Sequence, residues 1–152
     1  MAAVLVLLLV VAVAAGVWGF TKLRSAEATL DDRADVVRVA EQFAVSVNNY
    51  DASSIDDYKS SVGELLSTKF SAEFDKAMQD IVAQVQEAQM ESNGEVLASG
   101  VATIDNDSAR VLVVADAAVK TVFDDRDRHF RWEVSLVKVD GEWLVDDFTP
   151  VA

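Results

Sequence analysis

The residues with the clearest chemical potential are carboxylates that gather at two places, together with the only histidine of the chain. The sequence "DNDS" spans residues 105–108, "DDRDR" spans residues 124–128, and His129 follows directly. Bunched carboxylate oxygens are the ligands that hard divalent cations prefer. However, "DNDSAR" lacks the Gly and Glu of a calcium loop, and two arginines dilute the second cluster. We therefore interpret both clusters as polar hairpin tips and predict no bound metal and no cofactor.

His129 lacks the partners that nucleophilic catalysis requires. The chain contains 1 His and 0 Cys, which excludes thiol nucleophiles, thiolate metal sites and disulfides. A single histidine beside a polar cluster is more typical of a solvated turn than of a general base. The sequence also contains no Gly-rich phosphate loop, nucleophile elbow or zinc-spaced cluster. We expect no catalytic residue and no enzymatic activity.

A proton-transfer pocket is the enzymatic alternative, and it depends on a carboxylate turned into an apolar interior, where desolvation raises its pKa. A two-residue turn at Asp140-Gly141 would place Val134 opposite Asp147, so that Asp147 faces inward. A bulge at the glycine would shift the register by one and turn Asp146 inward instead. The candidates for lining such a pocket are Tyr50, Tyr58, Trp132, Trp143 and Asp147.

These aromatic candidates have a simpler interpretation as core residues. Trp132, Trp143 and Phe148 could surround a fatty or sterol ligand, but large aromatic side chains on strands normally fill an interior. Tyr50 and Tyr58 flank the connection between two predicted helices, where they line a pocket mouth or cap the core. The core interpretation is the one that the sequence favours.

The first twenty residues, "MAAVLVLLLVVAVAAGVWGF", are apolar and contain no charged side chain. As a helix, residues 2–20 would extend roughly 28 Å, against a hydrocarbon core of about 30 Å. A cleaved signal peptide is the alternative, since Ala12-Val-Ala14 resembles a cleavage site, but the basic flank of such peptides is missing. We predict a transmembrane anchor over residues 1–24 and one further domain over residues 25–152.

The charge of the chain limits its partners. All 26 acidic residues lie beyond the apolar run, against 13 Lys and Arg, which gives a formal net charge of -13. Such a surface repels nucleic acid and anionic headgroups. We expect no nucleic-acid partner, and contact with the lipid bilayer only through the N-terminal helix.

Hydrophobic periodicity predicts helices first and strands afterwards. Apolar residues recur at helical spacing in three stretches, and β-branched and aromatic residues dominate four later ones. The polar sequences at residues 105–108, 124–128 and 140–141 separate these strands. This order predicts an α+β domain whose helices pack on one face of an antiparallel meander. The expected helices cover residues 33–47, 55–65 and 71–85, and the expected strands cover residues 96–104, 110–123, 130–139 and 143–149.

The chain has an apolar run, then three predicted helices and a meander. The meander contains "NDSARVLVVADA" (106–117) and closes on "VKVDGEWLVDDFTPV" (137–151). This arrangement resembles the mammalian-cell-entry (Mce) associated membrane proteins of actinobacteria. The resemblance implies a nuclear transport factor 2-like fold, a cone in which a curved four-stranded antiparallel sheet wraps around three helices. It also implies a single-pass plasma-membrane protein with an extracytoplasmic domain. Such a protein would stabilise Mce-type lipid import complexes by contacting Mce-family proteins and their permease. The family offers no catalytic residue.

The flanking charges oppose the topology that the resemblance implies. Lys22 and Arg24 follow the apolar run, and the positive-inside rule alone would place the domain in the cytoplasm. A natural start upstream of Met1 with a basic flank would remove the conflict.

Protein contacts are expected at exposed polar segments, chiefly the "DDRDR" sequence and the "NNYDASS" loop at residues 48–54. The candidate contact residues are Asp124, Asp125, Arg126 and Arg128. Two further functions remain open: a small-molecule or lipid-binding pocket protein, of isomerase or dehydratase type, and a scaffold subunit of a secretion apparatus. The scaffold would be similar to the bitopic cone-fold components of type IV systems.

Overall fold

A computed structural model describes residues 30–151, and the predicted transmembrane anchor lies outside this range. None of the helices within these residues is long and apolar enough to cross a membrane. The compact unit that contains the sheet begins at Asp35. The described residues form a first helix (residues 30–48), β1 (Tyr50–Asp51), the 3-10 helix η1 (Ala52–Ser54), α2 (Ile55–Gly63), α3 (Thr68–Glu87), β2 (Glu91–Ile104), β3 (Ser108–Lys120), β4 (Asp125–Val139) and β5 (Glu142–Pro150).

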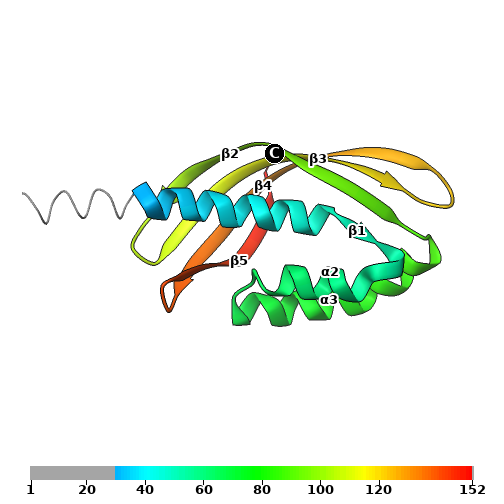
Figure 1. The fold of residues 1–152 in the computed structure, drawn as a ribbon, viewed down its shortest axis with the longest axis horizontal. Coiled ribbons are helices and arrows are strands. Elements are labelled where there is room, and N and C mark those ends of the chain that lie inside the picture. The colour runs from blue at the N-terminus through cyan, green and yellow to red at the C-terminus, as the bar shows by residue number, and fades with distance from the viewer. Residues whose placement is uncertain (1–29, 152) are drawn as a thin grey trace, which may run out of the picture. The chain divides into compact units, whose positions relative to one another are not determined.

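The strands form one antiparallel sheet in the order β1-β2-β3-β4-β5. It curls over the helices, which lie on one of its faces (Figure 1). The α+β prediction and the helix-covered antiparallel sheet are thereby confirmed. The predicted number of four strands is wrong, because Tyr50 and Asp51 pair with Ser92 and Glu91 as a fifth, two-residue strand. This pairing also explains why β2 begins five residues earlier than periodicity indicated.

The helices form where apolar residues recur on one side. Val36, Val39, Ala40 and Phe43 are buried on the first helix, at the spacing of one helical face. The predicted start of α3 at residue 71 is wrong, because the Ser67 hydroxyl accepts a hydrogen bond from the Phe70 amide at 3.1 Å. This capping contact satisfies an otherwise unpaired amide of the first turn.

Two of the three predicted turns are confirmed. Asp140 has φ 52° and Gly141 has φ 91°, the positive pair that a tight hairpin with right-handed twist requires. At the "DNDS" turn, the Asp105 amide donates to the Ser108 carbonyl at 2.8 Å.

The expectation that "DDRDR" forms a hairpin tip is wrong. The turn covers residues 121–124 and closes through a hydrogen bond from the Thr121 amide to the Asp124 carbonyl at 3.0 Å. Asp125, Arg126 and Arg128 already belong to β4 and pair with β3. The turn forms earlier because the Thr121 hydroxyl accepts from the amides of Phe123 and Asp124, a local bond typical of turns.

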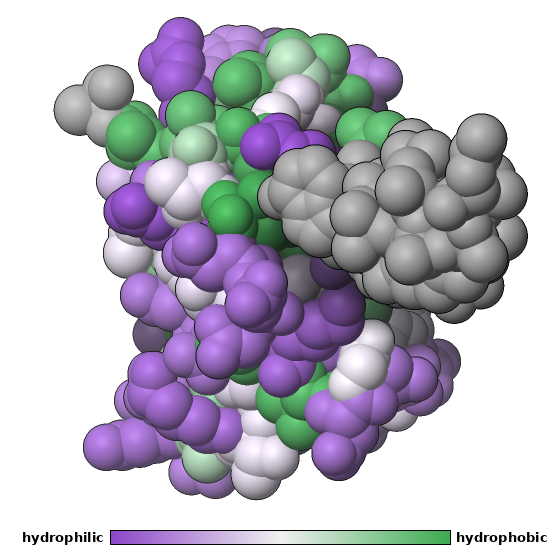
Figure 2. Space-filling view, turned by 90° about the vertical axis from the view of Figure 1, so that its left-hand side faces the viewer, coloured by the Kyte–Doolittle hydropathy of each residue, from purple (hydrophilic) through white to green (hydrophobic). Residues whose placement is uncertain are grey.

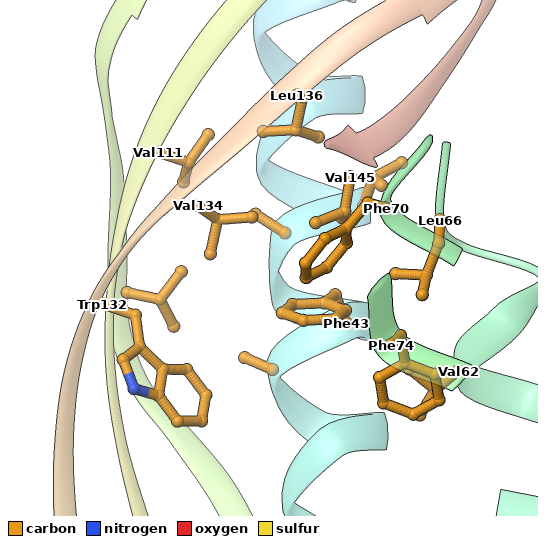
Figure 3. Packing of buried hydrophobic residues seen from close by; sticks show 14 of the residues in the cluster. Phe43, Val62, Leu66, Phe70, Phe74, Val111, Trp132, Val134, Leu136 and Val145 are labelled. Atoms are coloured by element: carbon orange, nitrogen blue, oxygen red, sulfur yellow. The ribbon is translucent and has the colours of Figure 1, made fainter. Parts of the chain in front are cut away.

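The core fills the space between sheet and helices. Phe43 of the first helix, Trp132 of β4 and Phe70 and Phe74 of α3 point into one interior (Figure 3). Phe148 of β5 contacts three of these rings, with centroid distances of 5.2 Å to Phe43, 5.4 Å to Trp132 and 6.0 Å to Phe70, all edge to face. Edge-to-face packing is a favoured arrangement of aromatic rings. The residues of the interior thus hold one another in place.

The exterior is strongly polar, as the net charge of -13 predicts. On the side seen in Figure 2, hydrophilic side chains cover the centre and the lower part, and the hydrophobic colour collects in smaller patches, chiefly near the top.

Candidate functional site

The predicted inward carboxylate is not inward. The β4–β5 ladder pairs Leu136 with Val145 as expected, but a register shift follows, and Val134 then lies opposite Phe148. Asp147 is consequently exposed. The prediction for Asp147 is wrong because the extra residue of the bulge reverses which side chains face the core. An aromatic ring takes the place where a catalytic carboxylate was expected.

Asp146, the residue that the ladder leaves unpaired, holds the sheet to the start of α3. Its carboxylate accepts a hydrogen bond of 2.6 Å from the Ser67 hydroxyl and one of 3.2 Å from the Lys69 ammonium. The Ser67 bond above all, with the Lys69 charge in addition, lowers the pKa of Asp146 from its usual value. A general base would need the opposite shift, so these contacts indicate a structural role.

The two tyrosine candidates form an aromatic group with α3. Tyr50 and Tyr58 pack edge to face at 5.7 Å, and Tyr58 lies 6.2 Å from Phe74. The Tyr58 hydroxyl donates to the Val47 carbonyl at 3.5 Å. Burial raises the pKa of Tyr58 to about 12, so this phenol keeps its proton at neutral pH. The arrangement corresponds to the core-capping interpretation of these residues.

The two tryptophan candidates lie far from each other on the sheet. Trp132 pairs with Pro150 and Trp143 pairs with Lys138, at opposite ends of the β4–β5 ladder. Both indoles are buried, and the Lys138 ammonium lies 5.2 Å from the centre of the Trp143 ring. The five pocket candidates therefore do not converge on a single cavity.

His129 lies within β4, not in a turn as expected, on the sheet face opposite the helices. Its Nδ1 is 2.8 Å from the Asp116 carboxylate on the neighbouring strand. Both side chains border a hollow of about 590 Å³ that Glu91, Glu95 and Asp127 also line. Within residues 30–151, no group of three His, Asp or Glu side chains is placed to hold a metal ion.

A second hollow lies between the end of α3 and the β3–β4 hairpin, and we call it the rim hollow. It has a volume of about 520 Å³. Its lining includes three of the four predicted contact residues, but not Asp125. It also includes Phe123, which the β-branched pattern predicts to be the last residue of a strand. The sequence signal that could have identified Phe123 is the apolar pair Val122-Phe123 directly before an acidic run. Among the lining residues are Glu87, Ala88, Met90, Val119, Phe123, Asp124, Arg126 and Arg128.

The chain has distant relatives among known proteins. No protein-family model matches it. It is similar to a Mycobacterium tuberculosis protein described as uncharacterized, found in two strains, with 27% identity over 154 residues that cover 97% of this chain and 70% of the relative.

Solved structures are similar in shape. An IcmL-like type IV secretion system protein from Legionella pneumophila has a TM-score of 0.66 at 13% identity, covering 79% of this chain and 94% of that one. The periplasmic domain of DotI has a TM-score of 0.65 at 12% identity, covering 76% and 92%. VirB8 from Agrobacterium tumefaciens has a TM-score of 0.56 at 10% identity, covering 78% and 90%. Another similar structure is described as an Ntf2-like protein, and the fold of the described residues is nuclear transport factor 2-like. At these identities the likeness establishes the fold and leaves function to the site.

Proposed function

We propose that this chain is a membrane-anchored, non-enzymatic assembly subunit of a transport complex in the cell envelope. Its nuclear transport factor 2-like domain lies outside the cytoplasm and binds other proteins through its surface. One observation carries the proposal: the interior of the cone is filled by the rings packed around Phe148. A ligand or substrate pocket in this position would need that space.

The two carboxylates of β5 and the buried polar atoms support the same conclusion. Asp147 is exposed, and Asp146 is bound by Ser67 and Lys69. Within the described residues, every buried side-chain nitrogen or oxygen has a hydrogen-bond partner. Unpartnered polar groups and strongly perturbed carboxylates are the usual marks of a catalytic pocket. The surface is therefore the part of the domain that we assign to function.

The comparisons favour a secretion-type scaffold as the kind of complex, since one of the similar structures, the IcmL-like protein, is described as a type IV secretion system protein. The sequence resemblance favours Mce-type lipid import, with Mce-family proteins and their permease as partners. Both versions require the same architecture, namely one membrane anchor, an extracytoplasmic domain and contacts with other subunits. The general role does not depend on which system contains the chain.

The topology can be tested with one cysteine, because the chain contains 0 Cys. Asn106 lies in the exposed β2–β3 turn, and Asn106→Cys should react with a membrane-impermeant thiol reagent on intact cells. The control is Val113→Cys at a fully buried position, which should stay unlabelled until the protein is denatured. Labelling of Asn106→Cys only after lysis would contradict the extracytoplasmic assignment.

The partners can be tested by cross-linking in native membranes and purification through a tag at the carboxyl terminus. The proposal expects integral or envelope subunits of one transport complex to be recovered in fixed ratios. Mce proteins with a permease would identify the lipid import version, and an export ATPase with channel components would identify the secretion version. Recovery of the chain without any protein partner would contradict the proposal.

A further inference from the structure

The tip of the β3–β4 hairpin exposes two adjacent apolar side chains. Val122 is 56% exposed and Phe123 is 81% exposed. The hairpin between β3 and β4 is the gold loop at the right of Figure 1. An exposed aromatic ring is a frequent anchor of protein interfaces, because it buries a large apolar area while losing little conformational entropy. Exposed apolar residues of this kind in an acidic domain are therefore candidates for a protein contact.

This tip is held in place by its own hydrogen bonds. The Thr121 hydroxyl accepts from the amides of Phe123 and Asp124, both at 3.0 Å. The Val122 amide donates to the Ala88 carbonyl at 3.0 Å, which joins the hairpin to the end of α3. A loop that is already ordered loses less entropy when a partner binds it. Phe123 is thus presented on a preformed support.

The rim hollow beside Phe123 combines an apolar wall with two arginines. Ala88, Met90 and Val119 contribute the apolar part. Arg126 donates from Nε to the Asp124 carboxylate at 2.6 Å, whereas no hydrogen bond or ion pair joins the Arg128 side chain to any residue between 30 and 151. Arg128 therefore offers its planar guanidinium group to an incoming carboxylate.

We propose that the rim hollow binds a segment of another protein in which a large apolar side chain lies within a few residues of an Asp or Glu. The apolar side chain would occupy the hollow against Phe123, and the carboxylate would pair with Arg128. This inference rests on the proposed function, because it names the surface through which the subunit meets its complex.

Charge decides between this occupant and two others. A net charge of -13 opposes docking on a surface of many anionic headgroups and opposes the association of two equally acidic copies of this chain. A single Asp or Glu in an apolar segment adds little repulsion, and Arg128 in the lining of the hollow compensates it. Two arginines, Arg126 and Arg128 of β4, and two carboxylates, Asp124 and Glu87, line the hollow. Asp124 is bound by Arg126, so Arg128 is the cation of β4 that is left to pair with an incoming carboxylate.

Photo-cross-linking with the full, tagged chain in native membranes tests the inference. The probe is p-benzoylphenylalanine in place of Phe123, and the matched control is the same probe in place of Leu97, which is 54% exposed on β2. The expected result is one discrete protein adduct from position 123, within a peptide that carries Asp or Glu beside a large apolar residue. Arg128→Gln should reduce its yield about ten-fold or more, and Arg128→Lys should restore part of it.

Arg131→Gln, an exposed arginine of the same strand on the opposite face, should leave the yield unchanged. Four results would overturn the inference: a lipid adduct, an adduct to a second copy of this chain, equal yields from positions 123 and 97, or a yield insensitive to Arg128→Gln. Affinity purification of a Phe123→Ala, Arg128→Gln double variant separates the two proposals. A complex still bound by this variant contradicts only the inference, whereas a wild-type chain without protein partners contradicts the proposed function.

Discussion

The carboxylate of Asp146 accepts a 2.6 Å hydrogen bond from the hydroxyl of Ser67, although 79 residues separate them in the chain. The same hydroxyl caps α3 by accepting from the Phe70 amide at 3.1 Å. Backbone bonds reinforce the contact, since the Ser67 amide donates to the Val145 carbonyl and the Val145 amide to the Leu65 carbonyl, both at 2.8 Å. The bulge in β5 therefore joins the last strand to the start of α3.

Replacing Asp146 should destabilise the domain. Asp146→Ala removes the acceptor of the hydroxyl of Ser67, a buried residue, and we expect the free energy of unfolding to fall by about 1–2 kcal/mol. Asp147→Ala is the control, because the neighbouring carboxylate is exposed, and it should change stability by less than about 0.5 kcal/mol. Urea unfolding of the two variants measures the difference. Equal effects would show that the Ser67 contact does not stabilise the fold.

The contribution of Asp146 should depend on pH. Its pKa is lowered in the folded state, so the folded protein binds the proton less readily than the unfolded chain. The stabilisation is therefore complete above pH ~4, the ordinary range of an Asp, and is lost as the pH falls through the lower folded value. Unfolding of wild type and Asp146→Ala at a series of acidic pH values should show the two stabilities converging. A constant difference down to the lowest pH would contradict the assigned cause.

Two glycines of β2 should respond in opposite ways to alanine. A Cβ at Gly94 would overlap the Cβ of Asn48, which cannot easily move because its carbonyl accepts from Ser92 at 2.6 Å. We expect Gly94→Ala to cost about 1–3 kcal/mol, the usual range for overpacking. Gly100→Ala meets no atom within 4 Å and should be neutral or stabilising by up to about 1 kcal/mol. Thermal unfolding of both variants tests the contact between the first helix and β2.

The filled interior predicts a large effect of Phe148. Phe148→Ala removes the ring that contacts Phe43, Phe70 and Trp132, and should cost about 3 kcal/mol, at the low end for buried aromatic residues because Phe148 is only partly buried. Phe123→Ala at the exposed tip should change stability by less than about 0.5 kcal/mol. Chemical denaturation compares them. A mild effect of Phe148→Ala would indicate that the rings do not fill the cone, and would revive the pocket hypothesis.

The sequence predicted the elements with a local signal and missed those that depend on distant partners. The Asp140-Gly141 turn was predictable because only a few residue types tolerate its positive φ values. The bulge at Asp146 was not, since its partner Ser67 lies 79 residues away. The charged residues of "DDRDR" are typical of a loop, yet they extend β4 because β3 offers a backbone ladder to pair with.

The candidate site was predicted in part, for a similar reason. Arg126 and Arg128 were selected as exposed charges, and both line the rim hollow. Phe123 was missed because an apolar residue at the end of a β-branched run normally indicates a buried strand. The turn at Thr121 ends β3 before Phe123, and this leaves the Phe123 ring exposed to solvent.

Native mass spectrometry of the tagged full chain, extracted from its own membranes in mild detergent without added ligand, tests the central claim most directly. If the domain is an assembly module with a filled interior, the chain should appear bound to further protein subunits, and removal of detergent should leave no small-molecule mass on the chain itself. A chain that appears alone and retains a lipid-sized or metabolite-sized mass would contradict the account and point to a ligand-binding cone.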